Sequence, residues 1–108
     1  MRIELPPPIV AYFVADEGTG TTVSECFTPD AVVRDEGHTY QGSSEIQNWK
    51  ATVAAKYTYT CEPLQVEQQG DATVVTCRLE GSFPGSPTNL RFFFHLAEDK
   101  IASLEVIQ

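Results

Sequence analysis

The stretch PDAVVRDEGHTYQG, from Pro29 to Gly42, decides the fold of this chain. Val32 and Val33 are β-branched, as is typical of a strand, and two glycines punctuate the run. Two carboxylates and a histidine follow the valines in the same stretch. The stretch therefore predicts a strand that delivers polar groups to a rim or pocket.

A helix is predicted directly after this strand. Ser43 or Ser44 can cap its first turn. Its apolar residues recur at three- and four-residue spacing, at Ile46, Trp49, Val53 and Tyr57. We expect a helix from about Ser44 to Tyr57 that covers the strand carrying Asp35.

Two further helices are predicted before the strand. Three consecutive prolines hold the chain extended until a helix begins near Pro8, and this helix should stop before Gly18. Its apolar side comprises Ile9, Val10, Tyr12 and Phe13. A turn at Gly18 and Gly20 leads to a short second helix, which Thr21 or Thr22 can cap. The buried stripe of that helix is expected to comprise Val23, Cys26 and Phe27.

The second half of the chain predicts strands only. They are expected at residues 57–68, 72–83, 89–97 and 101–107, separated by turns rich in Gly, Pro and Asp. Pro63 interrupts the first of them, which indicates an edge position or a bulge. The order of helix, helix, strand, helix and four meandering strands predicts an α+β domain. Its helices should gather on one side of a curved, mostly antiparallel sheet.

Composition and charge limit the classes of partner. The 108 residues fit one domain, and 42% of them are hydrophobic, enough for a compact core. The net charge is -8 and the 7 basic residues are scattered, so nucleic acid and anionic membrane surfaces are not expected partners. No run is long enough to span a membrane. No phosphate loop or metal-ligand spacing is present, so no metal or cofactor is expected.

The cysteines indicate a reducing compartment. Cys26, Cys61 and Cys77 are an odd number without a CxxC motif, so at least one thiol stays unpaired within a monomer. No signal peptide is recognisable at the N-terminus. A cytoplasmic protein is therefore expected. A disulfide between Cys61 and Cys77 would require their strands to be neighbours, which the sequence leaves open.

Three strings in this element order resemble a known superfamily. They are CFTPDAVVRDEG, YQGSSEIQNW and FHLAEDKIASLEV, and they resemble the nuclear transport factor 2-like superfamily, in particular its SnoaL-like and ketosteroid isomerase-like members. The resemblance implies a single SnoaL-like domain over residues 1–108. It also implies a cone-shaped, strongly curved, mixed but mostly antiparallel sheet, wrapped around three helices of the N-terminal half in the cystatin-like manner. Such cones hold an apolar cavity and usually form homodimers through the sheet.

The resemblance also implies candidate catalytic residues. Ketosteroid isomerase-like members place a tyrosine on the first helix, an aspartate at the end of the first strand and a second acid on a later strand. Tyr12 and Asp35 match the first two positions, whereas Phe92 stands near the third. SnoaL-like cyclases use an acid and often a histidine in the cavity, which Asp35 and His38 match.

Each candidate has a structural alternative. Asp35 shares a strand face with Val33 and can act as a general base in a pocket, or it can be a rim carboxylate paired with an arginine or a helix N-terminus. The Tyr12 hydroxyl can donate into the cavity, or the ring can simply cover the core. His38 can shuttle protons, or it can be a surface histidine of a loop.

The remaining aromatic and charged residues complete the expected surfaces. An apolar cavity would be lined by Trp49, Tyr57, Tyr59, Phe92 and Phe94, although an aromatic stripe is more often core. The outer sheet surface or a dimer interface should hold Arg91, Phe93 and His95. The carboxylates expected in solvent are Asp16, Glu17, Glu98 and Asp99.

Two hypotheses of function follow from these patterns. The first is a protein that binds a hydrophobic small molecule, with isomerase-type or other acid-base chemistry at Asp35 and Tyr12 or His38 as a polar helper. The second is a non-catalytic ligand-binding or dimerisation module of the same fold. An adaptor for protein partners would need a large exposed apolar patch beyond the dimer contact.

Overall fold

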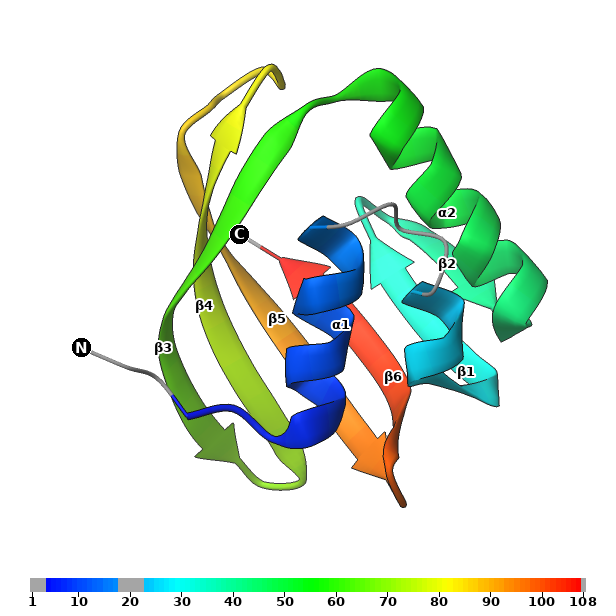
Figure 1. Ribbon diagram of the computed structural model, residues 1–108. Helices are drawn as coiled ribbons and strands as arrows, with labels where there is room; N and C mark the ends of the chain where they lie inside the picture. Colours follow the sequence, from blue (N-terminus) through cyan, green and yellow to red (C-terminus); the bar gives the residue numbers. More distant parts are fainter. Residues whose placement is uncertain (1–3, 18–22, 108) are drawn as a thin grey trace.

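A computed structural model describes residues 4–17 and 23–107 of the chain (Figure 1). The turn predicted at Gly18 and Gly20, and the cap predicted at Thr21 or Thr22, lie outside the described residues. The elements in chain order are α1 (Pro7–Glu17), the 3-10 helix η1 (Val23–Cys26), β1 (Phe27–Asp35), β2 (His38–Gln41), α2 (Gly42–Lys56), β3 (Tyr59–Gln69), β4 (Ala72–Gly81), β5 (Thr88–Ala97) and β6 (Lys100–Ile107).

The strands form one six-stranded sheet in the order β2-β1-β6-β5-β4-β3. All neighbours pair antiparallel except β1 and β6, which pair in parallel. Figure 1 shows the sheet bending around α1, with α2 on the side of β1 and β2. The predicted α+β class with a curved, mixed but mostly antiparallel sheet is therefore confirmed.

The prediction of three helices is not confirmed, because residues 4–17 and 23–107 contain two α-helices and a single 3-10 turn. Val23–Cys26 is only four residues long, and Phe27 already belongs to β1. Thr28 precedes Pro29, and a residue before proline is disfavoured in the helical region. The chain is thus extended from Phe27 onward, and Phe27 pairs with Ile101 of β6.

The stretch from Pro29 to Gly42 is a hairpin rather than one strand. Glu36 and Gly37 both have positive φ, 52° and 79°, as the tight turns that join antiparallel strands require. Asp35 pairs directly with His38 across this turn. The hairpin therefore places the carboxylate and the imidazole side by side at one end of the sheet.

The start of α2 differs from the predicted serine cap. The helix begins at Gly42, and its N-cap residue is Gln41, which makes no side-chain capping bond. Instead, the backbone N–H of Gln41 donates to Glu45 Oε1 over 2.8 Å, so an acidic side chain near the start of the helix satisfies this donor. The helix ends at Lys56, with Tyr57 as its C-cap.

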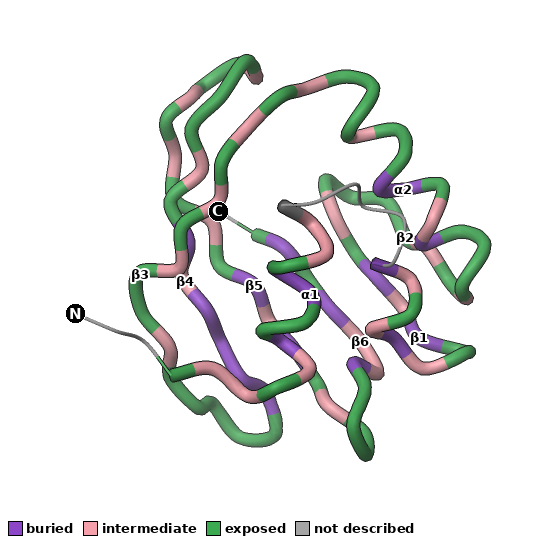
Figure 2. The backbone as a smooth tube through the Cα atoms, viewed as in Figure 1, coloured by how far each residue is buried: buried purple, intermediate pink, exposed green. Residues whose placement is uncertain are grey.

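The core lies between α1, α2 and the concave side of the sheet. Figure 2 shows buried segments of β1, β4, β5 and β6 behind α1. The largest fully buried side chains include Ile9, Tyr12, Val33, Ile46, Val75, Phe94, Ile101 and Leu104. Val10, predicted on the apolar side of α1, is 43% exposed, because it lies about 100° around the helix from Ile9.

Pro63 lies where an edge strand tolerates it. Strand β3 is at the edge of the sheet, and its register with β4 shifts between Pro63 and Gln65. Proline has no N–H for the ladder, so edges and bulges are its usual positions in sheets. Both features expected from the sequence are present together.

Candidate functional site

A pocket of about 470 Å³ lies between α2, the β1–β2 hairpin and the inner face of β3–β5. Its volume is in the range of pockets that hold small molecules. Aromatic side chains supply much of the wall, and carboxylates and ammonium groups supply most of its charge. The lining residues are Tyr12, Asp35, Glu36, His38, Tyr40, Trp49, Lys50, Thr52, Val53, Lys56, Tyr57, Tyr59, Leu79, Phe83, Pro84, Gly85, Thr88, Leu90, Phe92 and Val106.

Asp35 lines this pocket from the last position of β1 and is half-buried. The indole Nε1 of Trp49 donates a hydrogen bond of 3.0 Å to Asp35 Oδ2. Trp49 is 4% exposed and fixed on α2, so the helix holds the carboxylate in one orientation. One carboxylate oxygen is thereby anchored, and the other can accept a proton from a molecule in the pocket.

Tyr12 lines the pocket from α1 although its side chain is fully buried. Its ring makes edge contacts with Phe13, Phe27 and Phe94. Its hydroxyl has no hydrogen-bond partner among the described residues. Burial, and secondarily the nearby Asp16 carboxylate, raise the pKa of Tyr12 well above its ordinary value, so the hydroxyl keeps its proton and is a donor.

Replacing Tyr12 by phenylalanine should leave the free energy of unfolding unchanged or raise it by up to about 1 kcal/mol. An unpaired buried hydroxyl costs free energy in the folded state, and phenylalanine keeps the ring contacts while removing that cost. Urea unfolding at pH 7 measures the change. A loss above about 2 kcal/mol would show that the hydroxyl has a structural partner after all.

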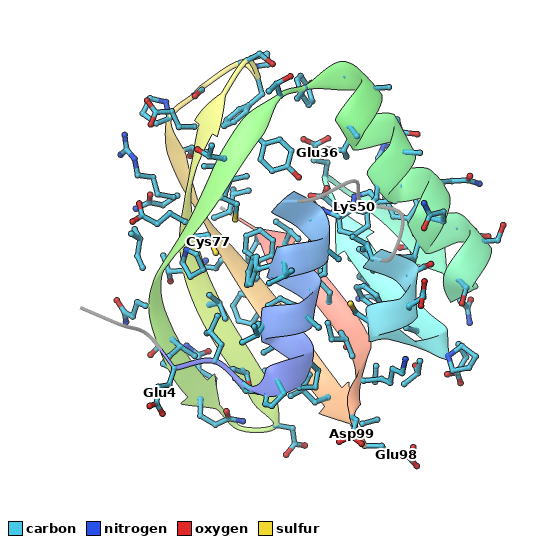
Figure 3. The ribbon with its side chains drawn as sticks, in the orientation of Figure 1. Glu4, Glu36, Lys50, Cys77, Glu98 and Asp99 are labelled. Atoms are coloured by element: carbon cyan, nitrogen blue, oxygen red, sulfur yellow. The ribbon has the colours of Figure 1, made fainter. Side chains whose placement is uncertain are left out.

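His38 lies at the rim of the same pocket. Its side chain is exposed, and its ring is 6.4 Å from that of Tyr40. The neighbouring Glu36 is also exposed and lines the pocket, and Figure 3 shows it near the gap between α2 and β3. The structure thus brings His38 to the same opening as Asp35, with Glu36 as a further carboxylate that the sequence did not single out.

Four of the five aromatic residues predicted to line a cavity do so, namely Trp49, Tyr57, Tyr59 and Phe92. Phe94 does not line the pocket. It is fully buried, and its ring packs 5.6 Å from that of Tyr12 and 6.0 Å from that of Phe13. Phe94 is therefore a core residue, as the alternative interpretation of the aromatic stripe allowed.

An ion pair inside the wall corrects the expectation that Asp16 is solvated. Lys50 Nζ lies 2.8 Å from Asp16 Oδ1, and the two side chains are only 8% and 11% exposed. The hydroxyl of Tyr59 donates to the same carboxylate at 3.2 Å. Burial and the Asp16 carboxylate raise the pKa of Tyr59, so this hydroxyl also stays protonated.

Two of the other carboxylates expected in solvent, Glu98 and Asp99, lie away from the pocket. Glu98 and Asp99 are exposed in the turn between β5 and β6, and Figure 3 shows them at the lower end of the molecule. The side chain of Glu17 lies outside the described part. Asp16 differs because the last turn of α1 faces α2 and the start of β3, where Lys50 and Tyr59 meet it.

Lys50 is a buried, charged pocket residue that the sequence analysis missed. A signal was present, because Lys50 is four residues after Ile46 and one after Trp49, which places it within the buried stripe of α2. The residues Phe83, Pro84 and Gly85, which precede β5, were also missed as pocket residues. They were interpreted only as a turn, and no local pattern shows that a turn folds over a pocket.

The cysteines do not form a disulfide. Strands β3 and β4 are neighbours, and the register places Cys61 opposite Leu79 and Cys77 opposite Pro63. The two thiols are therefore diagonal neighbours, and both are free. Interaction with the Cys61 side chain, followed by burial, raises the pKa of Cys77, so its thiol is protonated at neutral pH.

Side chains of β5 alternate between the outer face of the sheet and the core, as predicted. Arg91 and His95 are exposed and Phe93 is half-buried, while Phe92 and Phe94 face the core. The guanidinium of Arg91 covers the Phe93 ring at 5.6 Å, and His95 Nδ1 lies 3.1 Å from Ser103 Oγ. Phe93 is thus partly shielded within one chain.

Residues 4–17 and 23–107 lack the structural features of two other classes of site. In that part of the chain, no helix combines the length and apolar character needed to cross a membrane. The same residues contain no cluster of three or more histidine, cysteine or acidic side chains able to hold a metal ion.

Comparisons with known proteins identify similar sequences and folds. The family model described as a SnoaL-like domain matches residues 11–104. A Sinorhizobium meliloti protein provisionally assigned as a polyketide cyclase is 39% identical, with 94% of each chain covered and a TM-score of 0.89. A protein of ketosteroid isomerase-like fold from Catenulispora acidiphila, solved with trimethylamine, is 21% identical, with 97% of this chain and 87% of that one covered and a TM-score of 0.84.

A third solved structure has a similar fold. A cystatin-fold protein from Novosphingobium aromaticivorans is 18% identical, with 94% of this chain and 95% of that one covered and a TM-score of 0.75. No curated protein matches the sequence significantly. The structures below 25% identity support the fold alone.

Proposed function

Because the chain belongs to the SnoaL-like domain family, we propose that it binds a hydrophobic small molecule in the pocket beneath α2 and performs acid-base chemistry on it with Asp35. The observation that carries the proposal is the half-buried Asp35 carboxylate, which lines an aromatic pocket and is anchored by Trp49 at 3.0 Å. An oriented carboxylate in an apolar wall is the arrangement that proton abstraction needs.

The walls favour a ligand with a flat apolar body. Tyr40 and Trp49 lie 6.1 Å apart with their rings tilted by 32°, and Phe92 contributes a wall from β5. Flat aromatic walls bury apolar surface with little loss of side-chain freedom. In this proposal the curved sheet and α2 act as the cone that encloses the ligand.

The proposed chemistry divides the work among three residues. Asp35 takes a proton from the bound molecule and returns it at the same or a neighbouring atom. The protonated Tyr12 hydroxyl donates a hydrogen bond to the oxygen on which negative charge develops. His38, exposed at the rim, relays protons between the pocket and solvent. The provisional assignment of the Sinorhizobium meliloti relative as a cyclase supports this class of reaction.

The alternative function is a non-catalytic ligand-binding or dimerisation module. The observation that favours it is Phe92, which lines the pocket where the resemblance implies a second acid. Without that acid, one donor to a developing oxyanion is missing, and such a donor contributes about 2.7–4 kcal/mol in other enzymes. In this alternative, Asp35 serves only to hold Trp49.

Replacing Asp35 by asparagine separates the two functions. The test reaction is the exchange of hydrogen for deuterium next to the carbonyl of enolisable aromatic ketones. We expect the variant to catalyse this exchange at least about a hundredfold more slowly than the wild type, because the base is lost. Ligand affinity should stay nearly unchanged. NMR in D₂O measures the exchange, and the fluorescence of Trp49, the single tryptophan of the chain, measures binding.

The matched control is Asp99→Asn, which makes the same chemical change in an exposed turn. It should leave both exchange and binding at the wild-type level. A wild-type protein that binds the ketones without accelerating exchange supports the non-catalytic module. A protein whose Trp49 fluorescence responds to none of them contradicts the binding proposal itself.

The proposal extends to assembly and location. A homodimer would join two copies through the outer sheet face that carries Arg91, Phe93 and His95, and would cover the exposed part of Phe93. Sedimentation velocity tests this part, and a monomer throughout the accessible concentration range would contradict it. The free thiols Cys61 and Cys77 support a reducing cytoplasm as the location, which fractionation of the source cells would check.

A further inference from the structure

We propose that Lys50 and Tyr12 form a site for an anionic oxygen at the inner end of the pocket, so that the ligand is an aromatic molecule held through a carboxylate or an enolate oxygen. This inference rests on the ligand binding proposed above and names the chemical class of that ligand. It assigns a binding role to a lysine that the family resemblance did not predict.

The position of Lys50 is the first observation. Lys50 is only 7% exposed to solvent. Its ammonium lies 2.8 Å from Asp16 Oδ1 and 4.3 Å from the centroid of the Trp49 ring. Figure 3 shows Lys50 reaching from α2 to the end of α1. An ammonium has three N–H donors, and Asp16 accepts one of them. The remaining donors are available to an acceptor in the pocket, which Lys50 lines.

The setting of this lysine is unusual for a residue that only stabilises the fold. Position 50 lies in the buried stripe of α2, four residues after Ile46, where an apolar side chain would fit the core. Burying an ion pair is often no more favourable than burying apolar residues of similar size. A cation at this position is therefore better explained by what it can bind than by stability.

The Tyr12 hydroxyl is the second, independent observation. It is fully buried and has no partner among the described residues, and it lies on α1 one turn before Asp16. The Lys50 ammonium lies over the Tyr12 ring, 5.1 Å from its centroid, so the two side chains belong to one corner of the pocket wall. A ligand oxygen that accepts from Tyr12 would satisfy the unpaired hydroxyl.

The surrounding groups favour an anion rather than a cation at this end. The faces of Trp49 and Tyr12, which could bind a ligand cation, already carry the Lys50 ammonium. Asp16 is committed to Lys50 and Tyr59. The other ionisable residues around the pocket are Asp35, Glu36, His38, Tyr40, Lys56, Tyr57 and Tyr59, with Cys61 close to Tyr12 and Tyr59.

Three probes of one shape test the inference. They are 2-naphthoate, the neutral 2-naphthamide and the cationic 2-naphthylmethylamine, titrated into the protein by calorimetry at pH 7. We expect naphthoate to bind roughly tenfold more tightly than naphthamide, because a charge-assisted hydrogen bond is about twice as strong as a neutral one. This preference should hold although the net charge of -8 favours the cation at long range.

Paired variants assign the preference to Lys50. The double variant Lys50→Met with Asp16→Asn removes both charges of the pair without leaving one of them buried alone, and should bind naphthoate and naphthamide equally. Lys50→Arg is the matched control and should keep the preference. Circular dichroism verifies folding. Should the double variant not fold, Tyr12→Phe tests the second donor and should weaken naphthoate binding severalfold.

The outcomes distinguish this inference from the proposed function. Binding of all three probes with equal affinity, or a preference for the amine, overturns the anion site and leaves the apolar pocket in place. A naphthoate preference that persists in the double variant also overturns it. Failure of all three probes to bind contradicts the pocket proposal and the inference together.

Discussion

Replacing Asp16 by alanine is expected to lower the free energy of unfolding by about 3–5 kcal/mol, because it leaves the Lys50 ammonium buried without its counter-ion. Both side chains are nearly inaccessible, at 8% and 11% exposure, so water cannot easily replace the lost carboxylate. The change also removes the acceptor of the Tyr59 hydroxyl. The effect should therefore exceed that of breaking an exposed ion pair, which is commonly below about 1 kcal/mol.

Urea unfolding at pH 7, with a double-mutant cycle, measures this effect. The double variant Asp16→Ala with Lys50→Met should recover most of the lost stability, because neither charge then remains unpaired. The control Asp99→Ala, in the exposed turn before β6, should change stability by no more than about 0.5 kcal/mol. A loss below about 1 kcal/mol for Asp16→Ala would show that water reaches the pair.

Alkaline pH is expected to destabilise the protein steeply. Burial raises the pKa of Tyr12 and Tyr59 above the ordinary value of 10.0, and that of Cys77 lies above its ordinary 9.0. Above these ordinary values the unfolded chain loses protons that the folded chain retains. The unfolded state then binds fewer protons, so stability is full below about pH 9 and falls as the pH rises. Each group contributes about 1.4 kcal/mol per pH unit.

Urea unfolding from about pH 8 to about pH 11 tests this slope. Tyr12→Phe should reduce the slope above pH 10 by about a quarter to a third, because it removes one of the groups with a raised pKa and leaves Tyr59, Cys77 and the less buried Cys26. Cys77→Ser removes a thiol whose ordinary pKa of 9.0 lies below that of the tyrosines, and should make the decline between about pH 9 and pH 10 shallower. A stability that stays flat to pH 11 would mean that the buried hydroxyls ionise as easily as they do in water.

The sequence predicted most elements of the fold because their signals are local. Alternation in β5, the apolar stripe of α2 and the proline-interrupted edge of β3 each depend on residues close together in the chain. The boundary at Phe27 was misplaced because Val23 and Cys26 continue a helical spacing that the following Thr28-Pro29 pair overrides. The Glu36-Gly37 turn was missed because a glutamate at positive φ is rare.

The site was predicted less completely than the fold. Asp35, Tyr12 and His38 line one pocket, as the resemblance to SnoaL-like proteins implies. The Trp49–Asp35 bond and the Lys50–Asp16 pair join residues 14 and 34 positions apart in the chain. Neither pair has a local signature, since contact between them depends on how α1 and α2 lie on the sheet. Asp16 looked solvated because nothing near it in the sequence indicates a partner.

The place of β6 in the sheet has a consequence for how the protein is made. Residues 100–107 lie between β1 and β5, so they join the N-terminal hairpin to the later meander. Until this segment leaves the ribosome, the nascent chain has two unconnected blocks of strands with open edges. Folding must therefore wait for the pairing of β1 with β6, a contact between segments some 70 residues apart, of the kind that slows folding. A nascent chain stalled before residue 100 should accordingly depend on chaperones that shield those edges.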